Sequence, residues 1–321
     1  MAEGRRDLYI NPVDGNILIG SASWTDKSLI ACGRFYPPGC NSAEARLRHY
    51  ASQFPLVEVD SSYYGIPVPA NAQRWAERTP EGFTFNVKAF RLFTGHATSP
   101  IVLQKDLQQA LGPAAPRTLY YASTPPEIRD ELWRRFSLAL APLRAAGKLG
   151  AVHFQFAPWV TRNRAGIAHV AHCVERMPGD LLSVEFRHRS WFEGGDAQAA
   201  TLAMERALGV VHTIVDAPQG FDNTVPCVWA VTHPRLALLR LHGRNTATWN
   251  IRSETSSSRF DWWYAPDELA AMLPQVRQVA AEAAQLHIVF NTNREDQGQA
   301  NARLMRQLLR GLPALDEPAA S

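Results

Sequence analysis

The stretch LSVEFRHRSW, residues 182–191, shows the alternation that decides the fold. Apolar residues at 182, 184 and 186 alternate with polar or charged residues at 183, 185 and 187. Since successive side chains of a strand point to opposite faces, this pattern predicts a strand with one apolar and one charged face. The charged face must lie in water or in an interior that supplies partners, because an unpaired buried charge is costly.

Seven further segments are predicted to be strands, and nearly all eight are followed by a predicted helix. The eight segments are 16–24, 55–64, 83–88, 151–156, 182–191, 210–216, 235–242 and 286–291. Strand–helix alternation of this kind predicts a parallel (β/α)₈ barrel. A doubly wound sheet is the alternative, but no GxGxxG motif follows the first strand.

The segment after the third strand, residues 89–149, is longer than a simple crossover and contains a predicted helix over about 126–146. We interpret it as a helical insertion because strand–helix alternation resumes after it. The predicted organisation is a polar N-terminal arm (1–15), a single barrel domain (16–311) and a C-terminal tail (312–321).

The composition is that of a globular protein. The 321 residues carry a formal net charge of +3, which mildly favours an anionic ligand. The four cysteines show no CxxC spacing, so a disulfide framework or structural zinc is not expected. No signal peptide and no membrane-spanning run are visible, and we expect a cytoplasmic protein without a membrane partner.

Six of the predicted strands carry polar side chains at positions i and i+2 near their ends. The inward-facing ends of barrel strands meet at the C-terminal mouth, where active sites of this fold lie. A structural ion network is the alternative reading, and a one-residue register slip would turn the pairs outward. The pairs are Glu58/Asp60, Asn86/Lys88, His153/Gln155, Glu185/Arg187, Arg240/His242 and Asn291/Asn293.

The leading interpretation is an enzyme that binds a small anionic ligand at this mouth; the ligand would bear a phosphate or a carboxylate, and a sugar-like ligand is one of the options. Guanidinium and ammonium groups suit such anions, and carboxylates with histidines suit proton transfer. No cofactor is predicted. The candidate acid–base residues are Glu58, Asp60, His153, Glu185 and His242, and the candidate ligand-binding residues are Trp24, Tyr64, Lys88, Gln155, Arg187, Arg240, Arg244, Asn291 and Asn293.

Two alternatives remain open at this stage. In a metal-dependent hydrolase or nuclease, His153, His242, Glu185, Asp60 and Asp216 would hold a divalent metal, although the nearby basic groups would repel it. In a non-catalytic module, the basic loop over 244–259 would bind nucleic acid or a protein partner.

Several of these segments together resemble the YecE-like family of uncharacterised proteins, the domain of unknown function seventy-two. The resemblance spans roughly residues 16–311 and implies a TIM-barrel-like fold, but no established activity, cofactor or catalytic residue. The last strand ends in Asn291-Thr292-Asn293, where the family pattern has a histidine. The matching segments are GSASW (20–24), FYP (35–37), VEVDSSYY (57–64), WA (75–76), FTFNVK (83–88), FQ (154–155), VEFRHRSW (184–191), RLHG (240–243), Asn291 and NA (301–302).

Overall fold

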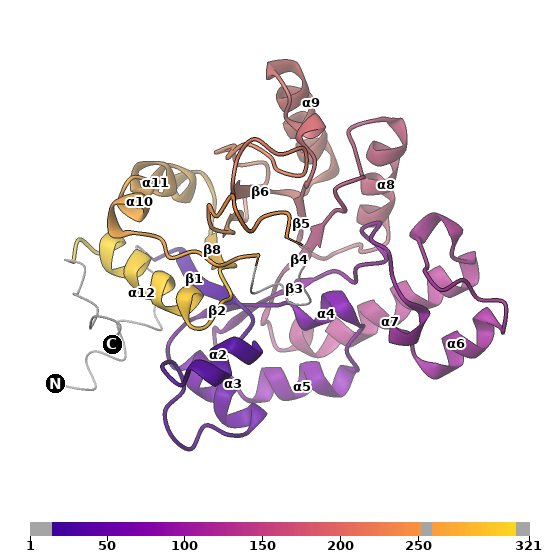
Figure 1. The fold of residues 1–321 in the computed structure, drawn as a ribbon, viewed down its shortest axis with the longest axis horizontal. Coiled ribbons are helices and arrows are strands. Elements are labelled where there is room, and N and C mark those ends of the chain that lie inside the picture. The colour runs from indigo at the N-terminus through magenta and orange to yellow at the C-terminus, as the bar shows by residue number, and fades with distance from the viewer. Residues whose placement is uncertain (1–14, 252–258, 313–321) are drawn as a thin grey trace. The chain divides into compact units, whose positions relative to one another are not determined.

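The computed structural model describes residues 15–251 and 259–312. Its eight strands form a closed parallel barrel in sequence order, which confirms the predicted (β/α)₈ fold (Figure 1). The strands are β1 (Ile17–Ala22), β2 (Leu56–Val59), β3 (Thr84–Lys88), β4 (Leu149–Gln155), β5 (Leu182–Glu185), β6 (Val211–Asp216), β7 (Ala237–Leu241) and β8 (Leu286–Phe290).

Helices and short 3₁₀ turns separate most of the strands, whereas a segment without a helix, residues 217–236, joins β6 to β7. The predicted insertion after β3 is confirmed as α6 and α7. None of the helices within the described ranges combines the length and apolarity needed to cross a bilayer. The helices are α2 (Lys27–Cys32), α3 (Ala43–Ala51), α4 (Ser61–Tyr64), α5 (Pro69–Glu77), α6 (Lys105–Leu111), α7 (Pro126–Ala145), α8 (Arg164–Glu175), α9 (Gly195–Leu208), α10 (Pro266–Ala270), α11 (Leu273–Glu282) and α12 (Gln297–Leu309), with 3₁₀ turns η1 (Pro100–Val102), η2 (Tyr121–Ser123) and η3 (Arg189–Trp191).

The chain divides into two compact units. Unit 1 comprises the described residues of Met1–Val57, Ile214–Gln219 and Cys227–Ser321, and unit 2 comprises Glu58–Thr213 and Gly220–Pro226. The prediction of a single barrel domain stays a prediction, and most of the predicted N-terminal arm and C-terminal tail lies outside the described residues.

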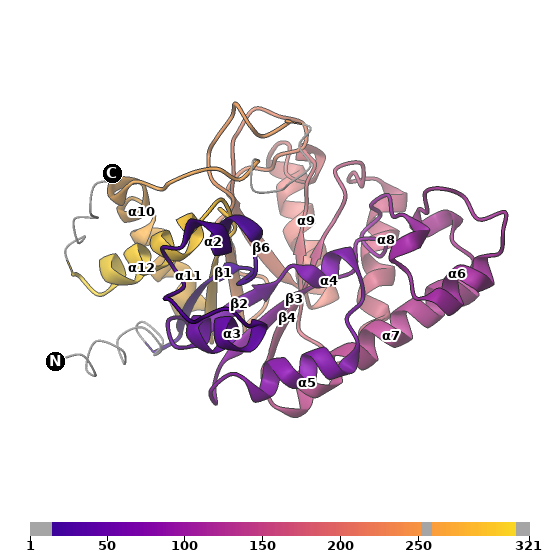
Figure 2. The same ribbon diagram turned by 60° about the horizontal axis from the view of Figure 1, so that its bottom comes forward.

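In unit 2, the apolar face of β3, β4 and β5 packs against helices. Helices α5 and α7 run side by side along these strands (Figure 2). Trp75 of α5 stacks on Phe85, and Trp133 of α7 stacks on Phe154, with ring centroids 6.3 and 6.1 Å apart. Because one face of the sheet is covered in this way, the opposite face, which carries the polar residues, faces the barrel interior.

In unit 1, β8 pairs in parallel with both β1 and β7, and α12 packs beside β1 and β8 (Figure 1). The buried Tyr50 hydroxyl connects β1 to Leu56. It accepts a hydrogen bond from Ser21 N at 2.8 Å and donates to Leu56 O at 3.1 Å. Strand β1 approaches the backbone at Leu56 so closely that an added Cβ at Gly20 would lie 1.9 Å from Leu56 O. Glycine is therefore a steric requirement at position 20.

Two predicted strands end earlier than the sequence indicated. The prediction placed 61–64 in a strand, but these residues form α4, because Ser62 Oγ donates to the carbonyls of Val59 (2.9 Å) and Lys88 (2.7 Å) and turns the chain. The strand predicted over 182–191 is also too long, because β5 ends at Glu185 and residues 189–191 form η3. Trp191 is fully buried and stacks on Phe186 at 3.8 Å, so it is a packing residue.

The close approach at Gly20 leads to a stability prediction. Gly20→Ala should lower the free energy of unfolding by about 3 kcal/mol, because the new methyl group forces β1 away from Leu56. Urea unfolding followed by circular dichroism measures this change. The control is Gly195→Ala in α9, where an added Cβ meets nothing within 4 Å, and we expect it to be neutral or slightly stabilising. Equal unfolding midpoints for the two variants would contradict the prediction.

Candidate functional site

Polar side chains on the interior face of unit 2 lie in rows across neighbouring strands. Lys88 pairs with His153 in the β3–β4 register, and His153 pairs with Ser183 in the β4–β5 register. The next row towards the carboxyl ends joins Gln155 and Glu185. Layers of this kind arise because the side chains of parallel strands align across a barrel. The sequence-predicted pairs on β3, β4 and β5 therefore share one face and end at the same edge.

Several contacts within this face meet at the Glu185 carboxylate. It is fully buried and accepts hydrogen bonds from Gln155 Nε2 at 2.7 Å and Arg187 Nη1 at 3.1 Å. His153 Nε2 lies 3.4 Å from the second carboxylate oxygen, and His153 Nδ1 lies 2.9 Å from Ser183 Oγ. Burial of this charge is tolerated because donors surround it.

A second ion pair lies at the ends of β2 and β3. Lys88 Nζ is 3.2 Å from Asp60 Oδ1, and both side chains keep some exposure, 10% and 20%. The Lys88 ammonium also lies 5.1 Å from the centre of the Tyr63 ring, a cation–π distance. The α4 turn positions Tyr63 there, since Tyr63 O accepts a hydrogen bond from Arg91 N at 3.0 Å.

Lys88 and Arg91 lie against Tyr63, and the charge of Arg187 also acts on Tyr63 and His96. Burial, assisted by the positive charges of Arg91, Lys88 and Arg187, lowers the pKa of His96 to about 3. Burial raises the pKa of the Tyr63 phenol, and the same three cations oppose that rise. Arg91 lies over the Tyr63 ring at 5.2 Å, and its buried Nε has no hydrogen-bond partner among the described residues. The nearby cations therefore disfavour the charged form of His96.

Aromatic rings border the cations. His96 contacts Tyr63 and Trp159 edge-on, with centroids 5.3 and 5.9 Å apart, and Tyr63 contacts Tyr64 at 5.0 Å. Tyr64 and Trp159 are 53% and 55% exposed. Of these residues, only Tyr64 was predicted to bind ligand. Sequence reasoning missed Tyr63, Arg91, His96 and Trp159, and the available signal was that they follow the strand ends at Asp60, Lys88 and Gln155.

Unit 1 holds a separate buried cluster. Arg240 Nη1 lies 3.4 Å from His242 Nε2, and the Asn291 amide lies 2.8 Å from His242 Nδ1. All three side chains are at most 2% exposed. Both ring nitrogens of His242 therefore face nitrogen atoms of neighbouring side chains, the Arg240 guanidinium and the Asn291 amide. The predicted proximity of Arg240, His242 and Asn291 is thus seen within this unit.

Arg244 is held by carboxylates. It donates to both Asp216 oxygens at 2.9–3.1 Å and to Glu268 at 3.2 Å, and Tyr264 OH donates to Asp216 at 2.5 Å. Tyr264 is buried, and burial together with the Asp216 charge raises its pKa well above the usual value. An anion would have to compete with two carboxylates for Arg244, and its role in ligand binding stays a prediction.

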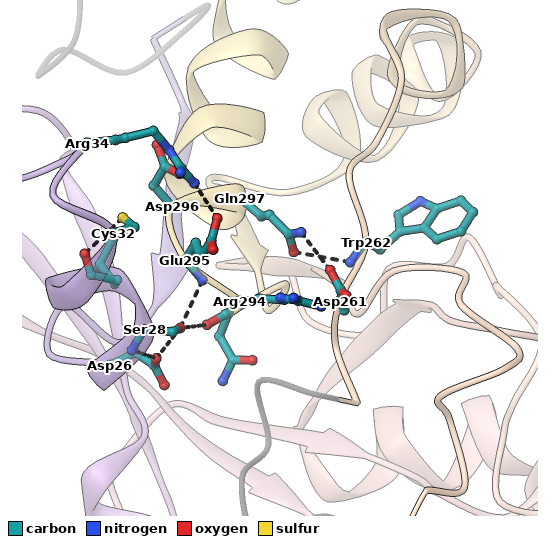
Figure 3. Close-up of polar contacts among 12 residues, drawn as sticks. Asp26, Ser28, Cys32, Arg34, Asp261, Trp262, Arg294, Glu295, Asp296 and Gln297 are labelled. Carbon is teal, nitrogen blue, oxygen red and sulfur yellow. Dashed lines mark hydrogen bonds and ion pairs between the residues drawn. The ribbon is translucent and has the colours of Figure 1, made fainter. Parts of the chain in front are cut away.

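Hydrogen bonds and ion pairs connect the loop after β8 to residues near α2 and to Asp261 (Figure 3). Ser28 Oγ donates to Asn293 O at 3.1 Å and accepts from Glu295 N at 2.8 Å, while Arg34 pairs with Glu295 and Asp296. Gln297 Nε2 donates to Asp261 at 2.8 Å. These contacts fix the segment that follows Asn291 and leave Asn293 half-buried.

The remaining predicted residues take other positions. Trp24 and Glu58 are buried, the latter fully. Asn86 Oδ1 accepts the Ala151 amide at 3.0 Å, next to a register shift between β3 and β4, so its side chain supports the sheet. Among the described residues, no group of three or more His, Cys, Asp or Glu side chains is arranged to hold a metal ion. The prediction that all six strand ends share one pocket stays a prediction.

Comparisons with known proteins connect the chain to a family without an assigned reaction. The family model "Protein of unknown function DUF72" matches residues 18–320. The UPF0759 protein YunF of Bacillus subtilis is 29% identical over 297 residues, 91% of this chain and 94% of that protein. A DUF72 family protein from Enterococcus faecalis has a solved structure with a TM-score of 0.73, 26% identity, and coverage of 95% of this chain and 99% of that chain. A family structure from Thermotoga maritima shares the fold, with a TM-score of 0.72 and 22% identity over 92% of this chain and 99% of that chain.

The effect of the nearby cations on His96 can be measured directly. Arg91→Gln should raise the pKa of His96 above its value of about 3, because one of the cations that disfavour the imidazolium is removed. An NMR titration of labelled imidazole groups gives both values. The control is Arg134→Gln on the exposed surface of α7, which should leave the His96 titration unchanged. A His96 that titrates near its ordinary value in the unmodified protein would contradict the electrostatic description.

Proposed function

Because the chain belongs to the DUF72 family, described only as proteins of unknown function, we propose its function from its own side chains. The proposal is an enzyme that binds a small anionic ligand at the carboxyl ends of β3, β4 and β5. Lys88, Arg91 and Arg187 bind the anion, and Glu185 with His153 transfers a proton. The observation that carries the proposal is that Lys88 and Arg91 both lie against the Tyr63 ring, at 5.1 and 5.2 Å.

The anion-binding part follows from charge and exposure. Lys88 and Arg187 keep about a tenth of their side-chain surface exposed, enough for contact with a ligand, while the rest is desolvated. A partly desolvated guanidinium or ammonium binds phosphate and carboxylate oxygens strongly because water competes poorly there. Arg91 adds a cation whose Nε has no partner in the described part of the chain.

The proton-transfer part follows from the Glu185–His153 pair. His153 Nε2 faces the Glu185 carboxylate at 3.4 Å, and His153 Nδ1 lies within hydrogen-bond distance of the Ser183 hydroxyl, at 2.9 Å. The Ser183 hydroxyl can donate or accept, so it orients the imidazole in either protonation state. A carboxylate and an imidazole held in this way can give and take a proton at the strand ends, as general acid–base catalysis requires.

The two other functions considered from the sequence stay predictions without a specific observation in their favour. The metal-dependent alternative requires ligands from both units. The nucleic-acid or protein-binding alternative uses the loop over 244–259, of which 252–258 lie outside the described residues.

Anion binding is tested by calorimetric titration with inorganic phosphate and with a small dicarboxylate. We expect saturable binding of at least one anion, and Lys88→Gln and Arg91→Gln should each weaken it roughly tenfold or more. The reason is that a hydrogen bond to a charged group contributes about 1.5–3 kcal/mol. Arg134→Gln, which removes an exposed cation of the same unit, should leave the affinity unchanged. Equal affinity in all four proteins would refute the assignment of the anion site.

Catalysis is tested by separating binding from turnover. In a screen of phosphorylated and carboxylated metabolites, a compound that the protein converts should still bind to Glu185→Gln, but its conversion should fall about 100-fold or more. The amide retains an oxygen that can accept from Gln155 and Arg187, so the fold should persist, and a thermal melt checks this. If the variant converts the compound at the unmodified rate, Glu185 is not the proton-transfer group.

A further inference from the structure

We propose that the anionic ligand is a phosphorylated sugar, with its phosphate among Lys88, Arg91 and Arg187 and its ring against the exposed face of Trp159. This inference deepens the proposed function and rests on it. Four observations support it, all within unit 2.

The first observation is that carboxylates accompany the cations. Asp60 contacts Lys88 at 3.2 Å, and Glu185 contacts Arg187 at 3.1 Å. Carboxylates repel a simple anion, so a site for phosphate alone gains nothing from them. Carboxylates do accept hydrogen bonds from hydroxyl groups, and charge-assisted bonds of this kind are strong. A ligand with both an anionic group and several hydroxyls uses both kinds of side chain.

The second observation is that Trp159 is exposed but fixed. Its side chain is 55% exposed, although its indole N–H donates to Gly95 O at 2.9 Å and His96 contacts it edge-on at 5.9 Å. A large exposed aromatic ring held by a hydrogen bond loses little conformational entropy when a ligand packs on it. The C–H groups on one side of a sugar ring form an apolar surface that fits such a ring.

The third observation is the mutual orientation of the rings. The interplanar angles are 88° for Tyr63 and Tyr64, 80° for Tyr63 and His96, and 66° for His96 and Trp159. None of these pairs presents two parallel faces, so a flat base cannot be sandwiched between them. A sugar ring needs only one aromatic face and polar partners at its edge, which this arrangement supplies.

The fourth observation is that His96 contacts both Tyr63 and Trp159. Lys88 and Arg91 lie over the ring of Tyr63, so His96 links the residues near the cations to Trp159. Its Nδ1 lies 3.0 Å from Thr94 Oγ1. A neutral imidazole both donates and accepts, so it can hydrogen-bond a sugar hydroxyl without adding charge. The site therefore runs from a phosphate-binding end to a ring-binding end.

Calorimetric titrations with glucose 6-phosphate, fructose 6-phosphate, ribose 5-phosphate, inorganic phosphate and adenosine monophosphate test this inference. At least one sugar phosphate should bind tenfold or more tightly than inorganic phosphate. Trp159→Leu should remove that advantage and leave the affinity for inorganic phosphate unchanged. The control is Trp263→Leu, which removes an exposed tryptophan outside unit 2 and should change neither affinity.

Each other outcome has a definite meaning. If inorganic phosphate binds and no sugar phosphate binds more tightly, or if Trp159→Leu preserves the advantage, the sugar inference is wrong and the anion site stands. If adenosine monophosphate is the only ligand whose affinity falls in Trp159→Leu, Trp159 packs against a nucleobase and the sugar inference is wrong. If none of these phosphates binds and a dicarboxylate does, the site binds carboxylates and the sugar-phosphate inference is wrong. If no anion binds, the proposed function fails together with the inference.

Discussion

A carboxylate buried at the end of β5 is the constraint on which the functional face of unit 2 depends. Glu185 is fully buried, and Gln155, Arg187 and His153 surround it at 2.7, 3.1 and 3.4 Å. A buried charge that loses its partners costs several kcal/mol, so each donor must stay in place. Because Gln155 lies on β4 and Arg187 follows β5, the carboxylate also locks the register of these two strands. The same group serves the fold and the proposed proton transfer.

The apolar side of the sheet provides the rigidity that such a site requires. Trp75, Trp133 and Trp191 stack on the outward-facing aromatic residues of β3, β4 and the end of β5. A one-residue slip of a strand would turn these rings towards the barrel interior and the charged side chains towards the helices. Such a slip is unfavourable for both faces of the sheet. Two kinds of interaction therefore fix the register of the polar rows. One is the aromatic packing on the outer face, and the other is the ion pairs on the inner face. Side chains held in this way are preorganised for a ligand.

Alternation along the strands was sufficient to predict the barrel and the inward face of β3, β4 and β5. It predicted that Lys88, His153, Gln155, Glu185 and Arg187 share a side, because strand periodicity is local. It could not predict where strands end, since the turn at Ser62 depends on a hydrogen bond to Lys88 O, 26 residues away. For the same reason it missed Trp159, whose orientation depends on Gly95 O.

The sequence also could not separate functional from structural charges. In the sequence, Arg244 and Lys88 are both cations near strand ends. In the structure, Arg244 pairs with the two carboxylates of Asp216 and Glu268. Lys88 instead pairs with one carboxylate, Asp60, and lies over the ring of Tyr63. Asn86 is predicted as a member of an inward-facing pair, and its Oδ1 accepts the Ala151 amide beside an irregular backbone pairing. These assignments depend on tertiary partners that no local pattern encodes.

The central claim is that an anion binds to the side chains of Lys88, Arg91 and Arg187. Crystals soaked in selenate, an oxyanion with a strong anomalous signal, test it most directly. The account predicts an anomalous peak within hydrogen-bond distance of at least two of these three side chains. Strong peaks elsewhere on the protein, with none beside Lys88, Arg91 or Arg187, would contradict it.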